Sequence, residues 1–227
     1  YEEFVNKEMK HFSKYDNDRS IPNLCDGLKI SLRKILYSAF KKNLNKEIKV
    51  AQFSGYVSEN SAYHHGEASL NGAIVGMAQD YLGSNNINLL MPNGQFGTRL
   101  AGGKDSASER YIFTMLNPLT RFIFPQEDDA ILDYLDDDGQ LMEPVYYAPI
   151  IPMLLVNGAK GIGTGFSTDI PCYSPKEIIR YLKGKLNHEI HNEFSDMLYY
   201  EGFKGTITKT EDNKFVIKGC CEIAGTD

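Results

Sequence analysis

The sequence predicts an α+β fold, and three observations support that prediction. Apolar residues recur at helical spacing through much of the first 82 positions. Beyond them, short β-prone segments alternate with turns rich in glycine, proline and asparagine. A hydrophobic content of 42% in 227 residues is enough to bury a core, in one large domain or two smaller ones.

Two helices are expected before residue 45. Residues 2–14 carry apolar side chains at helical spacing, and Asp16-Asn17-Asp18 is expected to end that helix. Residues 26–43 form the second helix, with Asp26 as its N-terminal cap. Its apolar stripe consists of Leu28, Leu32, Ile35, Leu36 and Phe40. Lys29 and Arg33 are four positions apart, so they share one face of this helix.

Two further helices, 50–59 and 66–82, are separated by a turn that contains Tyr63-His64-His65-Gly66. Two helices joined by such a turn predict a helix-turn-helix. A strand is expected at 87–90, a flexible glycine-rich stretch follows around Gly97, Gly102 and Gly103, and residues 112–116 are expected to form a returning strand. Together these elements indicate a winged helix, that is, a helix-turn-helix with a β wing.

The second half of the chain is more acidic and more β-prone. Residues 127–143 hold eight acids and no base, which predicts a solvated surface loop. Residues 145–156 are apolar and β-prone, and Pro175 to Leu186 are expected to form a helix with Pro175 in its first turn. Residues 203–219 are expected to form two strands around Glu211-Asp212-Asn213.

The net charge of −6 conceals an uneven distribution of charge. Residues 1–111 contain 14 Lys and Arg against 12 Asp and Glu, whereas residues 112–227 contain 10 against 18. A local basic face can bind phosphates even when the whole chain is acidic. The sequence has no apolar run long enough to span a membrane and no secretory signal, so an intracellular protein is expected. Its four cysteines lack metal-ligand spacing and are expected to be reduced thiols.

Several groups that could bind ligands have simpler interpretations. The glycines from Gly158 to Gly165 fit neither the P-loop nor the dinucleotide-binding spacing, so a nucleotide site is not favoured. His64 and His65 are adjacent and therefore point apart, which is poor geometry for joint metal binding; either could be structural or functional. Asp136 and Asp138 could bind Mg²⁺, but a hydrophilic turn before Gly139 is the favoured interpretation.

Tyr111 follows the glycine-rich stretch and is preceded by Arg110. A tyrosine at a strand edge is usually part of the core or its rim, so its position alone does not make it functional. As a nucleophile a phenol has a handicap, because a free phenol has a pKa near 10 and only about one in a thousand is ionised at pH 7. A neighbouring guanidinium such as that of Arg110 could stabilise charge on a phosphorus centre under attack.

A set of motifs, in this order, resembles the breakage-reunion region of eukaryotic-type DNA topoisomerase II, a type IIA DNA topoisomerase. They are DRSIP at 18–22, DGLK at 26–29, YHHGE at 63–67, PNGQFGTR at 92–99, GGKD at 102–105, SERY at 108–111, VNGA at 156–159 and GIGTG at 161–165. The resemblance covers nearly the whole chain and implies a winged-helix DNA-cleavage domain at 1–157. The beginning of an α/β tower domain would then occupy 158–227.

The resemblance also implies roles for individual residues. Tyr111 would attack the scissile phosphate and form a 5′-phosphotyrosine, Arg110 would stabilise the transition state, and His65 would lie near that phosphate. Ile162 would wedge between base pairs and bend the DNA, with Gly161 and Gly163 permitting close approach. The remaining DNA contacts implied by the family are Arg19, Lys29, Arg33, Tyr63 and Ser69.

The activity implied is ATP-dependent double-strand cleavage, strand passage and religation by a homodimer acting on double-stranded DNA. No E-G-D-S-A motif, convincing acidic metal pair or ATPase motif occurs, so no metal ligand is expected in this segment. Mg²⁺ is expected to be bound by a Toprim domain, and ATP by an ATPase domain, outside these residues. This segment alone is therefore expected to be inactive.

One departure concerns the source of the chain. The family often reads DGLKPGQRK where this chain reads DGLKISLRK at 26–34, which puts the start of that helix in doubt. The departure also leaves a large DNA virus open as the source, so the expected location is the nucleus, or a viral replication compartment or virion. Two rivals are a non-enzymatic winged-helix regulator and a cleaving enzyme of the archaeal type, which also sets a tyrosine on a winged helix.

Overall fold

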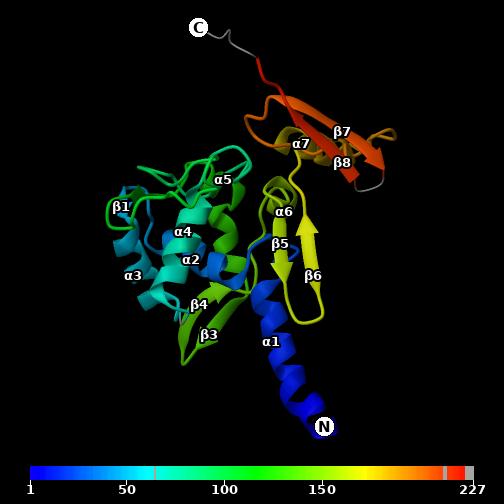
Figure 1. Ribbon diagram of the computed structural model, residues 1–227. Coiled ribbons are helices and arrows are strands. Elements are labelled where there is room, and N and C mark those ends of the chain that lie inside the picture. The colour runs from blue at the N-terminus through cyan, green and yellow to red at the C-terminus, as the bar shows by residue number, and fades with distance from the viewer. Residues whose placement is uncertain (64, 212–213, 223–227) are drawn as a thin grey trace.

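The computed structural model describes residues 1–63, 65–211 and 214–222, and it confirms the α+β class (Figure 1). The principal helices are α1 (Lys10–Ser20), α2 (Ile30–Lys41), α3 (Val50–Asn60), α4 (Glu67–Ala78) and α7 (Pro175–Leu186). Two single-turn helices are α5 (Thr120–Ile123) and α6 (Met153–Val156). The strands form antiparallel pairs: β1 (Ile48–Lys49) with β2 (Phe113–Thr114), β3 (Tyr134–Asp137) with β4 (Gln140–Pro144), β5 (Ala159–Ile162) with β6 (Ser167–Ile170), and β7 (Gly205–Glu211) with β8 (Lys214–Gly219).

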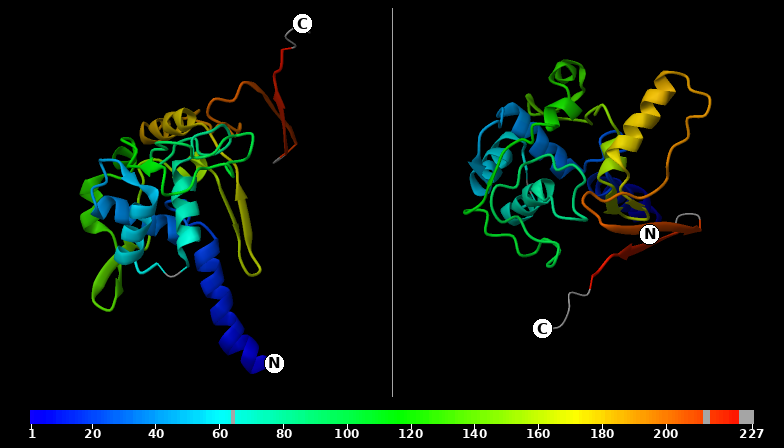
Figure 2. Two further views of the ribbon diagram at one scale, coloured as in Figure 1. Left: turned by 60° about the vertical axis from the view of Figure 1, so that its left-hand side comes forward. Right: turned by 90° about the horizontal axis from the view of Figure 1, so that it is seen from above.

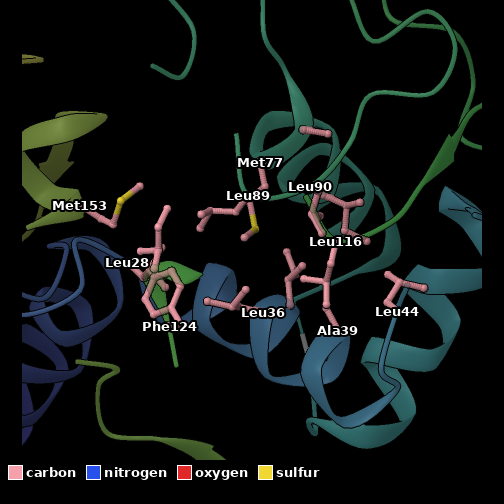
Figure 3. Packing of buried hydrophobic residues seen from close by; sticks show 14 of the residues in the cluster. Leu28, Leu36, Ala39, Leu44, Met77, Leu89, Leu90, Leu116, Phe124 and Met153 are labelled. Atoms are coloured by element: carbon pink, nitrogen blue, oxygen red, sulfur yellow. The ribbon is translucent and has the colours of Figure 1, made fainter. Parts of the chain in front are cut away.

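The hydrophobic core lies where α2, α3 and α4 meet the segments around Leu90 and Leu116 (Figure 3). Each helix contributes the apolar stripe expected from its periodicity. The side chains at the centre are almost completely shielded from solvent: Ile35, Leu36, Val50, Phe53, Val57, Leu70, Ile74 and Leu90. This core fixes the helix-turn-helix relative to the segment that carries Tyr111.

The first helix is longer than the sequence suggested. A π-helical turn at Phe4–Met9 leads into α1, which continues through Asp16-Asn17-Asp18 to Ser20. The expectation that these three residues end the helix was therefore wrong. Ile21 is extended, with φ −91° and ψ 129°, because the residue before a proline avoids the helical region. Pro22 is thus what ends the helix, and α1 projects away from the body towards the N-terminus (Figure 1).

The second helix begins later than expected. α2 begins at Ile30 with Lys29 at its cap position, so Asp26 is not the cap. Asp26 is instead fully buried and accepts hydrogen bonds from the backbone amides of Leu28 and Tyr147, at 2.9 Å each. Its carboxylate ties the loop before α2 to residue 147, across the core.

The helix-turn-helix is confirmed by α3 and α4, although α4 ends at Ala78 rather than at 82. His64, in the turn between them, lies outside the described residues. The wing is smaller than expected. Residues 87–90 form no strand, only an isolated bridge between Leu90 and Leu116, and the returning strand is reduced to β2.

The acidic segment at 127–143 is more structured than a surface loop. It contains a 3₁₀ helix at Gln126–Ile131 and the β3–β4 hairpin. Glu143 is 2% exposed and forms an ion pair with Lys34 at 2.9 Å. At the hairpin tip, Gly139 N donates to the Asp136 carboxylate at 3.0 Å, which confirms the turn interpretation of the two aspartates.

The later elements are partly as expected. Residues 145–156 form no strand and end in the short α6, whereas α7 occupies the expected 175–186, and β7 and β8 form the expected pair of strands. Ser174 caps α7 by accepting a hydrogen bond from Glu177 N at 3.4 Å, with Pro175 in the first turn. The glycine-rich segment forms the β5–β6 hairpin, so no glycine loop leads into a helix there.

Two asparagines join the body that carries α2–α4 to the later elements. The Asn86 side-chain amide donates to the backbone oxygens of Val156 and Tyr199, at 2.8 and 3.1 Å. The Asn157 side chain exchanges two hydrogen bonds with the backbone of Ile87, at 2.8 and 2.9 Å. All four cysteines are free thiols, as expected, and in the part of the chain that is described no helix is long and apolar enough to cross a membrane.

Candidate nucleic-acid cleavage site

Tyr111 lies on a turn immediately before β2, and its side chain is 72% exposed. Its own amide donates to Ser108 O at 2.9 Å. On both sides of Tyr111 the backbone is held by the first turn of α3: Val50 N donates to Ile112 O at 3.0 Å, and Ala51 N donates to Glu109 O at 3.1 Å. Free amides at a helix N-terminus need acceptors, and here the segment 109–112 supplies two. The phenol is therefore exposed while its backbone is fixed.

Arg110 is exposed beside Tyr111, with the guanidinium carbon 5.8 Å from the centre of the phenol ring. This distance is within the range of a cation–π contact. The arrangement leaves the guanidinium N–H groups available to an anionic group that approaches the phenolic oxygen.

The glycine-rich segment before Tyr111 is held by hydrogen bonds and is not an open flexible loop. The Asp105 carboxylate accepts from Thr98 N at 2.8 Å and from Thr98 Oγ1 at 2.7 Å, and Gly103 N donates to Thr98 O at 2.9 Å. Gly97, at φ +102°, lies so close to Gly103 that a β-carbon would come within 2.6 Å of its backbone. The glycines thus permit a compact loop, which corrects the expectation of flexibility.

A groove of about 730 Å³ separates α4 from the same loop. Glu67, Asn71 and Gly72 line it on the helix side, and Lys104 and Glu109 line it on the loop side. The groove runs up to the segment that carries Tyr111, so the surface next to the phenol is hollowed and partly polar.

The turn of the helix-turn-helix brings three of the expected residues together. The rings of Tyr63 and His65 meet edge to face, with 5.5 Å between their centres, and His65 is exposed. Ser69 is exposed on the first turn of α4. Burial raises the pKa of Tyr63, and the charge of Arg19 partly opposes that rise, so the end of α1 is electrostatically coupled to this turn.

The three expected basic contacts differ in accessibility. The Arg19 side chain is 46% exposed at the end of α1, and Lys29 is half-buried at the start of α2. The Arg33 side chain is only 5% exposed. Its Nε and Nη2 donate to the two carboxylate oxygens of Asp26 at 2.8 and 3.1 Å, and Nη2 also donates to Leu28 O at 2.9 Å. The expectation that Arg33 presents its charge to DNA does not match this position, because a buried carboxylate already binds that charge.

Ile162 ends β5 and is 82% exposed, near Phe166, which is 70% exposed in the connecting turn. The hairpin tip therefore presents two large apolar side chains to solvent, which is the condition for inserting into an apolar space.

Among the described residues, no group of three or more His, Cys, Asp or Glu could hold a metal ion. The donor set present here does not fit a catalytic metal, and no chemical step is derived through one.

Several residues in and around the site were not singled out from the sequence. Asp16, Asn17 and Thr164 link α1 to the β5–β6 hairpin, and Lys34 pairs with Glu143 in the core. The alternation of glycine with other residues at 161–165 is a signal that one face of this strand lies against a backbone. The partner surface on α1 carried no comparable signal.

Known proteins share this sequence and geometry. The family model for DNA gyrase and topoisomerase IV, in its A-subunit form, matches residues 19–226. A DNA topoisomerase 2 from Arabidopsis thaliana is 63% identical over 210 residues, which is 92% of this chain and 14% of that protein. The mitochondrial DNA topoisomerase 2 of Dictyostelium discoideum is 56% identical over 208 residues, covering 92% of this chain and 16% of that protein.

A solved structure is similar over nearly the same extent. The DNA-binding, cleavage and re-ligation domain of Plasmodium falciparum topoisomerase II superposes with a TM-score of 0.88 at 52% identity, covering 93% of this chain and 29% of that one. The chain thus spans about one seventh of the length of the curated relatives named above.

Proposed function

Because this chain belongs to the DNA gyrase and topoisomerase IV family, on its eukaryotic topoisomerase II branch, we propose that it binds double-stranded DNA and cleaves it through Tyr111. The intact protein would be an ATP-dependent type IIA DNA topoisomerase that acts as a homodimer. It would break both strands, pass a second duplex through the break and religate. Residues 1–157 would form the winged-helix cleavage domain and 158–227 the start of the tower.

The observation that carries the proposal is the setting of Tyr111. An attacking phenol must reach a phosphate on a large ligand, so it must be exposed, and it must be held in line, so its backbone must be fixed. Tyr111 meets both conditions, being 72% exposed and hydrogen-bonded on either side to the first turn of α3.

The proposed step is a transesterification. The phenolic oxygen of Tyr111 forms a bond to phosphorus, the bond from phosphorus to the 3′ oxygen breaks, and the phenolic proton is released while the 3′ oxygen takes one up. One phosphoester replaces another, so religation by the reverse step needs no ATP. Arg110, beside the ring, would donate to the non-bridging oxygens as charge builds on them. His65 would contribute a further donor near the phosphate.

The DNA contacts we propose surround this centre. Arg19 and Lys29 would bind phosphates, and Tyr63 and Ser69 would contact the duplex at the helix-turn-helix. Ile162 would enter a base step and bend the duplex, since an exposed apolar side chain at a hairpin tip is suited to wedging. Arg33 would act on DNA only indirectly, by fixing the loop before α2 through Asp26.

The family implies Mg²⁺ and ATP use in the full-length protein. We propose that both are bound by segments other than these 227 residues, with Mg²⁺ in a Toprim domain and ATP in an ATPase domain. Because double-stranded DNA of a eukaryotic cell lies mainly in the nucleus, that is the compartment we propose. A viral location has no support in the relatives named above.

The test is a covalent-trapping assay on the full-length protein with supercoiled DNA and Mg²⁺. Denaturation during the reaction should leave protein attached to 5′ ends, and Tyr111→Phe should abolish both this product and relaxation, since the phenolic oxygen is the nucleophile. Tyr146→Phe, which alters another exposed tyrosine, is the control and should behave as wild type.

Relaxation by Tyr111→Phe would show that the nucleophile is another residue. DNA binding without any covalent product in the wild-type protein would favour the non-enzymatic winged-helix regulator instead.

A further inference from the structure

The β5–β6 hairpin rests on the last turns of α1. Figure 1 and Figure 2 show this hairpin beside the end of α1 that adjoins the body. At Gly161 a β-carbon would collide with the backbone oxygen of Ser20, and at Gly163 it would collide with the side chain of Asn17. Both glycines therefore turn the same face of the strand to α1. Because side chains alternate along a strand, Ile162 between them points the opposite way, to solvent.

Two hydrogen bonds pin the hairpin turn to this helix. The hydroxyl of Thr164 donates to the Asp16 carboxylate at 2.8 Å, and the side-chain amide of Asn17 donates to Thr164 O at 3.2 Å. The bond from Thr164 is the main reason why the pKa of Asp16 lies below its usual value, so the carboxylate stays ionised at neutral pH. Thr164 is two residues from Ile162, and so the pins act close to the proposed wedge.

Asp16 also faces the residues that lie towards the cleavage site. Its carboxylate accepts from Ser20 Oγ at 3.2 Å and lies 3.6 Å from a guanidinium nitrogen of Arg19. The charge of Arg19 in turn acts on Tyr63, whose ring packs against His65. A continuous set of contacts therefore leads from the hairpin tip, through the last turn of α1, to the turn of the helix-turn-helix.

We propose that Asp16, Asn17 and Thr164 are positioning residues that brace the Ile162 hairpin against α1 and so allow it to bend DNA for cleavage. This inference rests on the proposed function and deepens it. Prying a base step apart requires force on the wedge, and a hairpin held only at its base would tilt away from the duplex. The bonds at Thr164 resist that tilt next to the tip. They also tie the wedge to the helix that carries the phosphate-binding Arg19.

The experiment compares Thr164→Val with Thr164→Ser in the full-length protein. Valine keeps the shape of threonine but cannot donate to Asp16, whereas serine keeps the hydroxyl. Bending is read as energy transfer between dyes on the two ends of a short duplex, and cleavage as covalently trapped DNA. Because a hydrogen bond to a charged group is lost, we expect Thr164→Val to lower bending and cleavage by about fivefold to tenfold, and Thr164→Ser to stay within about twofold of wild type.

A matched control is Thr168→Val, which alters the same hairpin at a hydroxyl that bonds to none of the described residues. It should leave bending and cleavage unchanged. Asp16→Ala, which removes the acceptor while keeping a good helix former in α1, should reproduce the effect of Thr164→Val.

A double variant separates bracing of the wedge from a general structural role. If Thr164 acts through Ile162, adding Thr164→Val to Ile162→Ala should cause no further loss of bending. If Thr164 merely supports the fold, the two losses should add and the melting temperature should fall.

Failure of the brace and failure of the wedge give different results. Normal bending by Thr164→Val, together with impaired bending by Ile162→Ala, would overturn the bracing role and leave the proposed function intact. Normal bending by Ile162→Ala would instead remove the wedge from the proposed function itself.

Discussion

Arg33 is a basic residue that serves the fold from inside the molecule. Its guanidinium binds both oxygens of a fully buried carboxylate, that of Asp26, and also the backbone oxygen of Leu28. A buried ion pair gains little net stability over an apolar pair, but removing one partner leaves an uncompensated buried charge. The free energy of unfolding should therefore be sensitive to either residue.

We expect Arg33→Ala to lower the free energy of unfolding by about 3–5 kcal/mol, because Asp26 would remain buried without its counter-ion. Urea unfolding followed by circular dichroism measures the change. Lys29→Ala, which alters a half-buried lysine on the same segment, should change the value by less than about 0.5 kcal/mol. A loss below about 1 kcal/mol for Arg33→Ala would mean that solvent reaches Asp26 and screens its charge.

At this scale the sequence was informative where a motif carries the chemistry. It singled out Tyr111, Arg110 and Ile162, and the structure finds all three exposed. It could not separate Arg33 from Lys29, because both are basic and four positions apart, and burial depends on a partner carboxylate elsewhere in the fold. Their roles on DNA remain predictions until the variants above are measured.

At the scale of secondary structure, the N-terminus of α3 does two things. It begins the helix-turn-helix, and its first two amides hold Ile112 and Glu109 on either side of the nucleophile's position. The helix thus positions Tyr111 through backbone hydrogen bonds, which no side-chain pattern encodes.

Val50→Pro tests this clamp. Proline is well suited to the first position of a helix, and Lys49 before it already has φ −58° and ψ 138°, as a residue preceding proline should. The variant loses the N–H that binds Ile112 O, so cleavage should fall by about fivefold, the equivalent of one net hydrogen bond. Val50→Ala keeps that N–H while losing side-chain contacts, and serves as the control. Equal cleavage by the two variants in the trapping assay would contradict the clamp.

The helices were predicted better than the strands, for a physical reason. α3, α4 and α7 follow from local periodicity and end signals. Strands at 87–90 and 112–116 were expected from local composition, but a strand exists only where a partner lies alongside, and here only β1 pairs with β2. The end of α1 was misplaced because Asp16-Asn17-Asp18 was taken as a break, whereas two of these residues hold the β5–β6 hairpin.

At the scale of the molecule, charge is divided between the two halves of the chain. The first 111 residues carry a slight positive balance, and the remainder holds 18 acids against 10 bases. A duplex would therefore be drawn to the surface of the first half, and the acidic half would discourage other modes of binding.

The logarithm of the DNA association constant should fall linearly with the logarithm of salt concentration, because bound phosphates release counter-ions. If Lys29 contacts one phosphate, Lys29→Ala should reduce the steepness of that line by about 0.9. Fluorescence anisotropy of a labelled duplex at several salt concentrations gives the slope. Lys176→Ala, on the exposed face of α7, is the control and should leave the slope unaltered, and an unaltered slope for Lys29→Ala would exclude that contact.

The attachment of residues 109–112 to α3 has a consequence for where a duplex would be cut. The surface that seats the duplex and the phenol that attacks it belong to the same packed unit, so the interval between them is constant, like that of a caliper with locked jaws. In the proposed reaction the break would fall at a set number of nucleotides from the seat. Base sequence would then govern how often a break occurs, through the ease of opening a step to Ile162, and would not govern its offset.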